Sequence, residues 1–193
     1  MPNWCNTAYA IEGDAQEVKA LYDLMKGLEE RKEPSIANDF GTTWLGCLVD
    51  ALGADWHKAS CRGCWDCLEL DNGVLTFRTE TAWDSCNEVF DLVREKYPSL
   101  CYYYQAEEPE SGYHGTNDSE GVYFPERYFV ELFTDKGDWV SEYFTNLPSA
   151  YKWIEEIAGV PVQSEQDVQL LIHKWQKANS NAFIGINGFL IEK

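Results

Sequence analysis

The fold class that the sequence predicts is α+β, and three observations predict it. Strands and helices are expected in the order strand, helix, strand, strand, helix, strand along the first part of the chain. The dipeptide Asn72-Gly73 is a strong hairpin signal between the two middle strands, because both residues tolerate positive φ. This hairpin has one apolar and one polar side, as in a sheet that carries its helices on one face. Together these features predict a ferredoxin-like βαββαβ sheet over residues 1–122 and a C-terminal α+β extension over residues 123–193, packed on the first sheet or extending it.

A strand, a long helix and a short helix are expected within residues 3–53. Residues 3–13 (NWCNTAYAIEG) alternate between two faces, which is typical of a strand. Asp14 is the expected N-cap of the long helix, and Gly53 ends the short helix over residues 43–53. The apolar residues of the long helix recur at helical spacing and are Val18, Leu21, Tyr22, Met25 and Leu28.

The hairpin over residues 64–83 has a register that its two-residue turn sets. Leu70 is expected opposite Leu75 on the apolar side. Asp66 is expected on the same side, opposite Thr79, where a carboxylate needs partners or the open end of the sheet. The pairs expected between these two are Glu69 with Thr76, Leu68 with Phe77, and Cys67 with Arg78.

The remaining elements follow from the same patterns. Residues 85–97 are expected as an amphipathic helix that Pro98 stops, and residues 99–108 as the fourth strand. Residues 109–121 (PESGYHGTNDSEG) are predicted as a polar loop. The elements predicted beyond the loop are extended segments around a turn at 135–138, helices over 148–159 and 164–179 (the second capped by Ser164), and a closing strand over 182–192.

The composition allows a sizeable core and sets the charge of the surface. Of the 193 residues, 45% are hydrophobic and 15% aromatic, so global disorder is rejected. The chain has 33 acidic residues against 15 Lys and Arg, a formal net charge of −18. This charge disfavours direct binding to nucleic acids and to anionic membranes. It is interpreted either as serving solubility alone or as attracting a basic or DNA-binding partner protein.

The cellular location is predicted from features that the sequence lacks. No stretch approaches the roughly 18 apolar residues of a membrane span. The start, MPNWCNTAYAIEGDAQ, lacks the basic and apolar regions of a signal peptide. The seven cysteines are therefore expected as reduced thiols of a cytoplasmic protein, and their odd number argues against a complete disulfide framework.

The stretch HKASCRGCWDC offers four candidate zinc ligands, which are His57, Cys61, Cys64 and Cys67. A tetrahedral site requires that all four groups converge at about 2.0–2.3 Å from one ion. Side chains alternate along a strand, so Cys64 and Cys67 are expected on opposite sides of the sheet. Reduced structural thiols are therefore favoured and no cofactor is predicted, while zinc binding and a regulatory disulfide are the alternatives.

Several short motifs resemble one known family in their order along the chain. They are MPNWCNTAYAIEG, CWD, TETAWDS, and KYPSL leading to YYYQAEEPESGYHG, and they resemble the YubB-like ferredoxin-like domain over roughly residues 1–122. This family comprises largely uncharacterised proteins of phages, plasmids and other mobile elements, so the resemblance implies a fold and a genomic context and no reaction. The matching positions are Asn3, Trp4, Asn6, Trp65, Asp66, Trp83, Ser85, Tyr97, Pro98, Glu108, Pro109, Gly112 and Gly115.

The residues expected to contact a partner come from these positions and from an acidic loop. Asp66 is interpreted either as a carboxylate that caps a loop or helix end or as an acid of a binding cleft. The loop EEPESGYHGTNDSEG is interpreted either as a mobile, solvated segment or as a contact surface. The partner-binding candidates are Trp65, Asp66, Trp83, Glu108, Tyr113 and His114.

Catalytic motifs are missing from the sequence. It has no Gly-x-Ser-x-Gly, no phosphate-binding Gly-rich loop and no His-x-x-x-His, so an enzyme is not expected, although a deep pocket joining Asp66, Glu108 and His114 would favour one. The leading hypothesis is a non-enzymatic interaction module of a phage, plasmid or conjugative element. One alternative is an acidic DNA mimic, because ten acidic and two basic residues lie between Gln105 and Glu142 with aromatic residues interleaved. The other alternative is a zinc-binding protein.

Overall fold

The computed structural model describes residues 2–192, and the chain forms two compact units, each with a hydrophobic core of its own. Unit 1 runs to Ser119 and includes Glu192, and unit 2 is Glu120–Ile191. The predicted α+β class is confirmed, because the described residues contain five helices and two sheets. None of the helices within residues 2–192 combines the length and the apolar character that a membrane crossing requires.

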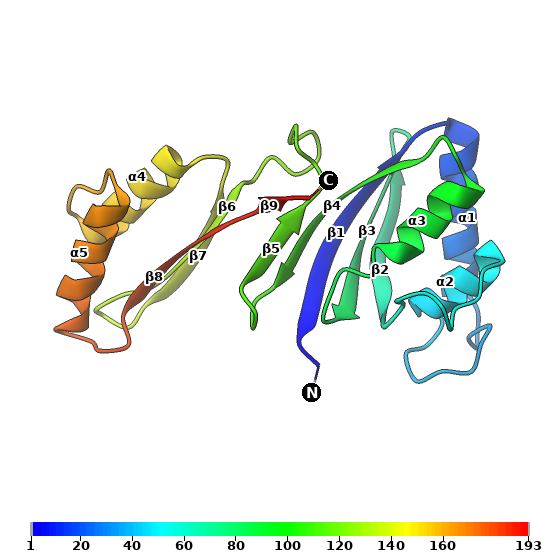
Figure 1. Ribbon diagram of the computed structural model, residues 1–193, viewed down its shortest axis with the longest axis horizontal. Coiled ribbons are helices and arrows are strands. Elements are labelled where there is room, and N and C mark those ends of the chain that lie inside the picture. The colour runs from blue at the N-terminus through cyan, green and yellow to red at the C-terminus, as the bar shows by residue number, and fades with distance from the viewer. Residues whose placement is uncertain (1, 193) are drawn as a thin grey trace. The chain divides into compact units, whose positions relative to one another are not determined.

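Unit 1 contributes five strands to its sheet, in the order β2-β3-β1-β4-β5 (Figure 1). Their bounds are β1 Trp4–Glu12, β2 Gly63–Asp71, β3 Val74–Ala82, β4 Cys101–Glu108 and β5 Tyr113–Thr116. Each neighbouring pair is antiparallel. The order differs from that of the predicted four-stranded βαββαβ sheet by the additional strand β5, which lies in the segment predicted as a loop.

The helices of unit 1 lie on one face of its sheet and bury the core against it (Figure 1). They are α1 Ala15–Glu29, α2 Leu45–Leu52 and α3 Glu88–Lys96. Asp14 is the N-cap of α1, as predicted, and its Oδ1 accepts the Gln16 N–H at 2.9 Å. Gly53 ends α2 in the left-handed conformation at φ +91°, which glycine adopts without a steric cost.

The β2–β3 hairpin has the predicted register next to its turn and a shifted register farther from the turn. Leu70 lies opposite Leu75, but the register shifts between Asp66 and Glu69, where Cys67 has a φ of +52°. This is a β-bulge, in which an additional residue on one strand moves every later side chain to the other face. The predicted position of Asp66 opposite Thr79 is therefore wrong, and so is that of Cys67 opposite Arg78. Asp66 lies opposite Arg78, and Trp65 takes the place opposite Thr79.

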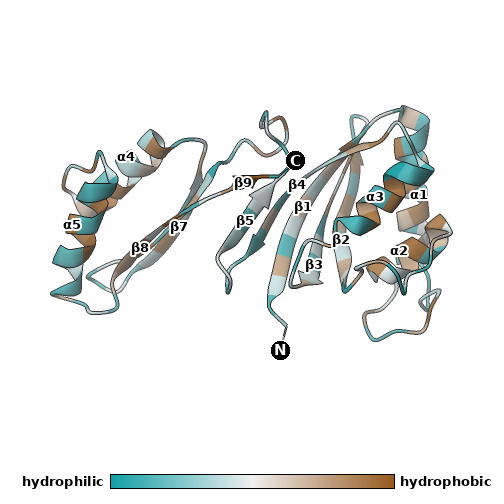
Figure 2. Cartoon of the chain, viewed as in Figure 1, coloured by the Kyte–Doolittle hydropathy of each residue, from teal (hydrophilic) through white to brown (hydrophobic). Residues whose placement is uncertain are grey.

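Unit 2 is a three-stranded antiparallel sheet in the order β7-β6-β8, with two helices that bury one of its faces. The elements are β6 Tyr128–Phe133, β7 Trp139–Phe144, α4 Leu147–Ala158, α5 Glu165–Gln176 and β8 Phe183–Gly188, followed by the short β9 Leu190–Ile191. Val130 and Leu132 of β6 are fully buried against Ile154 of α4 and Val168 of α5. Figure 2 shows teal and brown sides on α5, as expected of a helix with one buried face.

Ser164 starts α5, as predicted, through a reciprocal pair of hydrogen bonds. Its Oγ accepts the Asp167 N–H at 3.2 Å and donates to Asp167 Oδ2 at 2.7 Å. The same carboxylate oxygen accepts the Gln163 N–H at 3.0 Å. Asp167 therefore takes the role that Glu or Gln has in a capping box, and these bonds lower the pKa of its carboxyl group.

Candidate functional site

Two of the predicted contact residues, Trp83 and Glu108, lie at the end of the unit 1 sheet where β1 begins. Asn3 connects them, since its carbonyl accepts the Trp83 N–H at 2.9 Å and its Nδ2 donates to Glu108 Oε2 at 3.3 Å. Trp83 is 52% exposed, and its backbone is left-handed at φ +79°. This end of the sheet therefore presents an indole ring to solvent on a constrained backbone.

Glu108 is buried and is held by its own turn. Its carboxylate accepts the N–H groups of Glu110 at 2.8 Å and Ser111 at 3.0 Å. Hydrogen bonding from the Ser111 side chain, followed by that from Asn3, lowers the pKa of the Glu108 carboxyl group. These bonds make Glu108 a structural cap of the β4–β5 turn, and little of its charge is presented to a partner.

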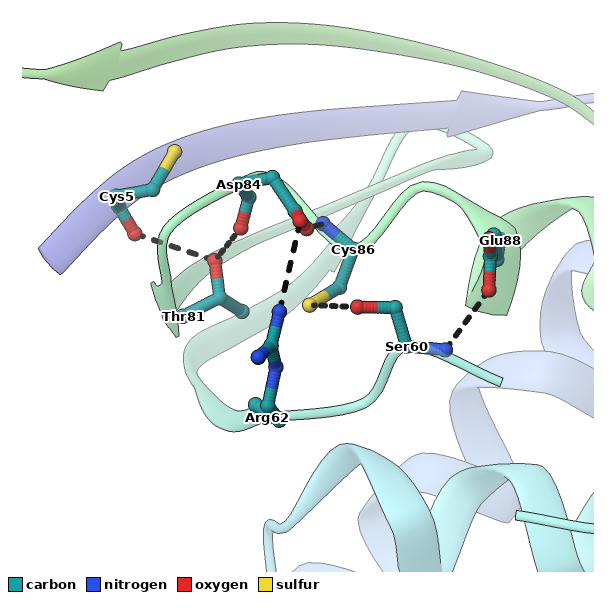
Figure 3. Close-up of polar contacts among 7 residues, drawn as sticks. All are labelled: Cys5, Ser60, Arg62, Thr81, Asp84, Cys86 and Glu88. Carbon is teal, nitrogen blue, oxygen red and sulfur yellow. Dashed lines mark hydrogen bonds and ion pairs between the residues drawn. The ribbon is translucent and has the colours of Figure 1, made fainter. Parts of the chain in front are cut away.

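The β3–α3 loop next to Trp83 is tied to neighbouring segments by polar contacts (Figure 3). Asp84 Oδ1 accepts the Cys86 N–H at 2.9 Å, and Asp84 Oδ2 lies 3.8 Å from an Arg62 guanidinium nitrogen. Ser60 donates its backbone N–H to Glu88 Oε2 at 2.8 Å, and its Oγ lies 3.5 Å from Cys86 Sγ. Residues 83–87 are therefore fixed to the segment that leads into β2.

Cys86 is the cysteine at the centre of this network, but its environment opposes nucleophilic chemistry. The side chain is 2% exposed, and burial raises its pKa to about 11. A reactive cysteine requires a lowered pKa, because the thiolate is the nucleophile. The thiol therefore stays protonated at neutral pH and packs as a small apolar group.

Trp65 and Asp66 do not form a site with the other predicted residues. Trp65 is 2% exposed and belongs to the core of unit 1. Asp66 is exposed on β2, which β3 and β1 separate from Glu108 on β4. Neighbouring strands lie about 4.8 Å apart, so the pocket that would have joined Asp66, Glu108 and His114 is not formed.

Tyr113 and His114 belong to β5, so the expectation of a mobile loop is wrong for this segment. Glu108 lies opposite Tyr113 and Glu107 opposite His114 in the β4–β5 ladder. Consecutive residues of a strand point to opposite faces. Tyr113 donates its hydroxyl to Glu192 at 2.7 Å, and His114 is buried with Nδ1 3.3 Å from the Gly112 carbonyl.

The four candidate zinc ligands are in different environments. His57 is exposed, with its ring 3.7 Å from the Trp56 ring and its Nδ1 3.0 Å from Asp55. Cys61 is buried, Cys64 is half-buried and Cys67 is exposed. Between residues 2 and 192, no three His, Cys, Asp or Glu side chains form a group that could hold a metal ion.

The surface with the clearest binding chemistry is the outer face of unit 2, the side of its sheet opposite α4 and α5. Residues paired across antiparallel strands share a face, and the register groups three rows. The rows are Trp139–Phe133–Phe183, Ser141–Glu131–Gly185 and Tyr143–Phe129–Asn187. Trp139 is 60% exposed, and its ring lies 6.1 Å from that of Phe133 and 5.2 Å from that of Phe183.

Glu131 occupies the middle of this outer face. Gly185 gives it room, since a Cβ there would come within 3.1 Å of Glu131 Cγ and 3.3 Å of its carboxylate. No described residue forms a hydrogen bond or an ion pair with the Glu131 carboxylate. A carboxylate between aromatic rings suits a cation, because the ring faces and the charge both attract it.

Part of this outer face had a signal in the sequence. The interleaved aromatic residues between Gln105 and Glu142 include Phe129, Phe133 and Trp139. The signal did not identify their shared face, because that depends on the strand register and on the contribution of β8. Comparisons of the chain with models of known families, with curated proteins and with solved structures find no match.

Proposed function

We propose that this chain is a non-enzymatic interaction module that binds a basic partner protein on the outer face of unit 2. The proposal depends on the Glu131 carboxylate, which lies between two rows of aromatic rings and forms no hydrogen bond or ion pair with a described residue. An arginine-bearing segment fits this surface, because a guanidinium group pairs with a carboxylate and stacks on aromatic rings.

The charge of the whole chain supports a basic partner. A formal net charge of −18 attracts a cationic protein over a distance and speeds encounter at low salt. Short-range contacts on the outer face then give specificity. The binding is therefore expected to weaken with salt and still to depend on individual side chains.

The experiment compares labelled peptides of equal length that are rich in arginine, lysine or glutamate, with fluorescence anisotropy as the readout. The arginine peptide is expected to bind most tightly, and Trp139→Ala and Glu131→Gln each to weaken it about tenfold or more. Leu170→Ala is the matched control, because Leu170 is 70% exposed in the same unit but belongs to α5. Equal binding by Trp139→Ala and Leu170→Ala would contradict the proposal.

The chain would be a DNA mimic if it occupied the DNA-binding site of a basic partner protein. Competition measures this directly, since duplex DNA and the chain would then displace each other from the same partner. Displacement by DNA would support the mimic, and a ternary complex would support binding outside the partner's DNA site.

We also propose that unit 1 is an elaborated ferredoxin-like domain of the YubB-like kind, carried by a mobile element. The order β2-β3-β1-β4 supports this, because β3 lies between β1 and β2, and β1 between β3 and β4, as in a split βαβ repeat. Strand β5 is then an addition next to β4. Flanking genes of phage or plasmid maintenance are the expected finding in the source genome, and a conserved housekeeping operon would contradict the origin.

A further inference from the structure

A groove in unit 1 lies beside α3 and β4 and has a volume of about 500 Å³. Asp91 and Arg94 of α3, Tyr102 and Tyr104 of β4, Asn117 and Glu192 contribute to its lining. Asn117 shapes its edge by pairing with the β4 backbone, as its Oδ1 accepts the Tyr104 N–H at 2.8 Å and its Nδ2 donates to the Tyr102 carbonyl at 2.9 Å. All of these residues belong to unit 1.

Tyrosine hydroxyls orient the two carboxylates of this groove. Glu192 accepts from Tyr113 at Oε1 and from Tyr104 at Oε2, and Asp91 Oδ1 accepts from Tyr102 at 3.1 Å. Burial, followed by the Asp91 carboxylate, raises the pKa of Tyr102 to about 12, so its hydroxyl stays protonated and donates a hydrogen bond. A carboxylate has about four acceptor positions, so both groups can accept further hydrogen bonds from a ligand.

Gly115 allows Tyr113 to reach Glu192. A Cβ at Gly115 would lie within 2.2 Å of the Tyr113 hydroxyl oxygen, so only glycine leaves room for the ring. The hydroxyl then lies 2.7 Å from Glu192 Oε1. Tyr113 of β5 and Tyr104 of β4 therefore both fix the position of the Glu192 carboxylate.

The charges and rings of the groove favour a planar cation. The half-buried Tyr102 ring supplies the aromatic surface of the groove, whereas the Tyr104 ring, 6.4 Å from it and inclined by 27°, is buried and packs beside it. Arg94 also lines the groove but forms no ion pair with a described residue, so neither carboxylate is paired with it. A guanidinium group combines a flat face for the ring with a fork of N–H donors for carboxylates, whereas an ammonium group has no flat face.

We propose that this groove binds a guanidinium group, with the Asp91 and Glu192 carboxylates as acceptors and the half-buried Tyr102 ring as its stacking surface. The site does not depend on the partner proposed for unit 2. The guanidinium group belongs either to a small free compound or to an arginine side chain of a protein.

The test uses titration calorimetry on the full chain carrying Trp139→Ala and Glu131→Gln, so that unit 2 does not capture the probe. N-acetyl-arginine amide is expected to bind, and its neutral isostere, N-acetyl-citrulline amide, is not. Asp91→Asn and Glu192→Gln are each expected to weaken binding about tenfold or more. Arg94→Gln is expected to strengthen binding, because it removes a like charge from the groove.

Glu95→Gln is the matched control, because it removes one carboxylate from the same helix but outside the groove lining. Thermal unfolding of each variant verifies that the fold is kept. Equal affinity of Asp91→Asn, Glu192→Gln and Glu95→Gln would overturn the proposal, and so would equal binding of the arginine and citrulline probes. Ethylguanidinium separates the two sources: binding as tight as that of the arginine amide indicates a free compound, and weaker binding indicates an arginine side chain.

Discussion

At the scale of single residues, Cys67 decides which side chains of β2 face the core. Its left-handed backbone forms the bulge that moves Trp65 into the core and Asp66 onto the polar side. The sequence has no glycine at this position to signal the bulge. Strand alternation therefore predicted the pairs nearest the Asn72-Gly73 turn correctly and failed beyond Glu69.

The raised pKa of Cys86 predicts that the folded state loses stability at alkaline pH. The thiol of the unfolded chain has the ordinary pKa of 9.0, whereas burial raises that of the folded state to about 11. The unfolded state therefore binds fewer protons between these values, and the contribution of Cys86 to the free energy of unfolding falls by up to about 1.4 kcal/mol per pH unit. Below pH 9 this contribution is fully present.

Denaturant titrations from pH 8 to pH 11 measure this decline. Cys86→Ala is expected to show a shallower fall than the parent chain, and Cys101→Ala, which removes an exposed thiol, the same fall as the parent. Half-buried Tyr102 acts in the same direction at higher pH, since its pKa is raised to about 12. A slope in Cys86→Ala equal to that of the parent would refute the assignment.

At the scale of elements, local signals identified the helices and their caps. Asp14 and Ser164 were predicted from their residue type just before a periodic apolar pattern, and both are N-caps. Strand β5 was missed, because a four-residue strand with a glycine inside an acidic, glycine-rich segment has the composition of a loop. Its pairing with β4 comes from tertiary structure and leaves no periodicity in the sequence.

The cap of α1 gives a prediction for this element. Asp14→Ala removes the acceptor of the Gln16 and Glu17 N–H groups and is expected to lower the free energy of unfolding by about 1 kcal/mol. Asp23→Ala removes an acid of the same helix that has only an exposed ion pair with Lys19, and it is expected to cost less than about 0.5 kcal/mol. Urea titration measures both, and equal losses would show that the cap is not the cause.

At the scale of the whole molecule, composition predicted the charge but not the surfaces that use it. The unpaired Glu131 and the Asp91–Glu192 groove each combine residues from different elements. Glu192 was expected to end a closing strand, and nothing near it in the sequence indicates its bonds to Tyr104 and Tyr113, 88 and 79 residues away. Long-range contacts of this kind cannot be derived from local patterns.

Because the two units have separate cores, a core mutation in one unit is expected to destabilise that unit alone. Leu132→Ala removes a fully buried side chain of unit 2 and is expected to destabilise that unit by about 2–5 kcal/mol. Hydrogen exchange followed by NMR should then speed up in β6 and α5 and stay unchanged in β1 and β3. Leu48→Ala, in the core of unit 1, should give the reverse pattern, and faster exchange throughout the chain in either variant would contradict the separation.

The backbone N–H of Glu192 donates to the Thr116 carbonyl at 2.8 Å, so the chain comes back almost to the point at which it leaves unit 1. The segment between Ser119 and Glu192 is therefore a domain inserted into unit 1. Excising it and joining its borders with a short glycine-serine bridge should yield a miniature that keeps the tyrosine-lined groove, and grafting another domain into the gap should be tolerated equally well.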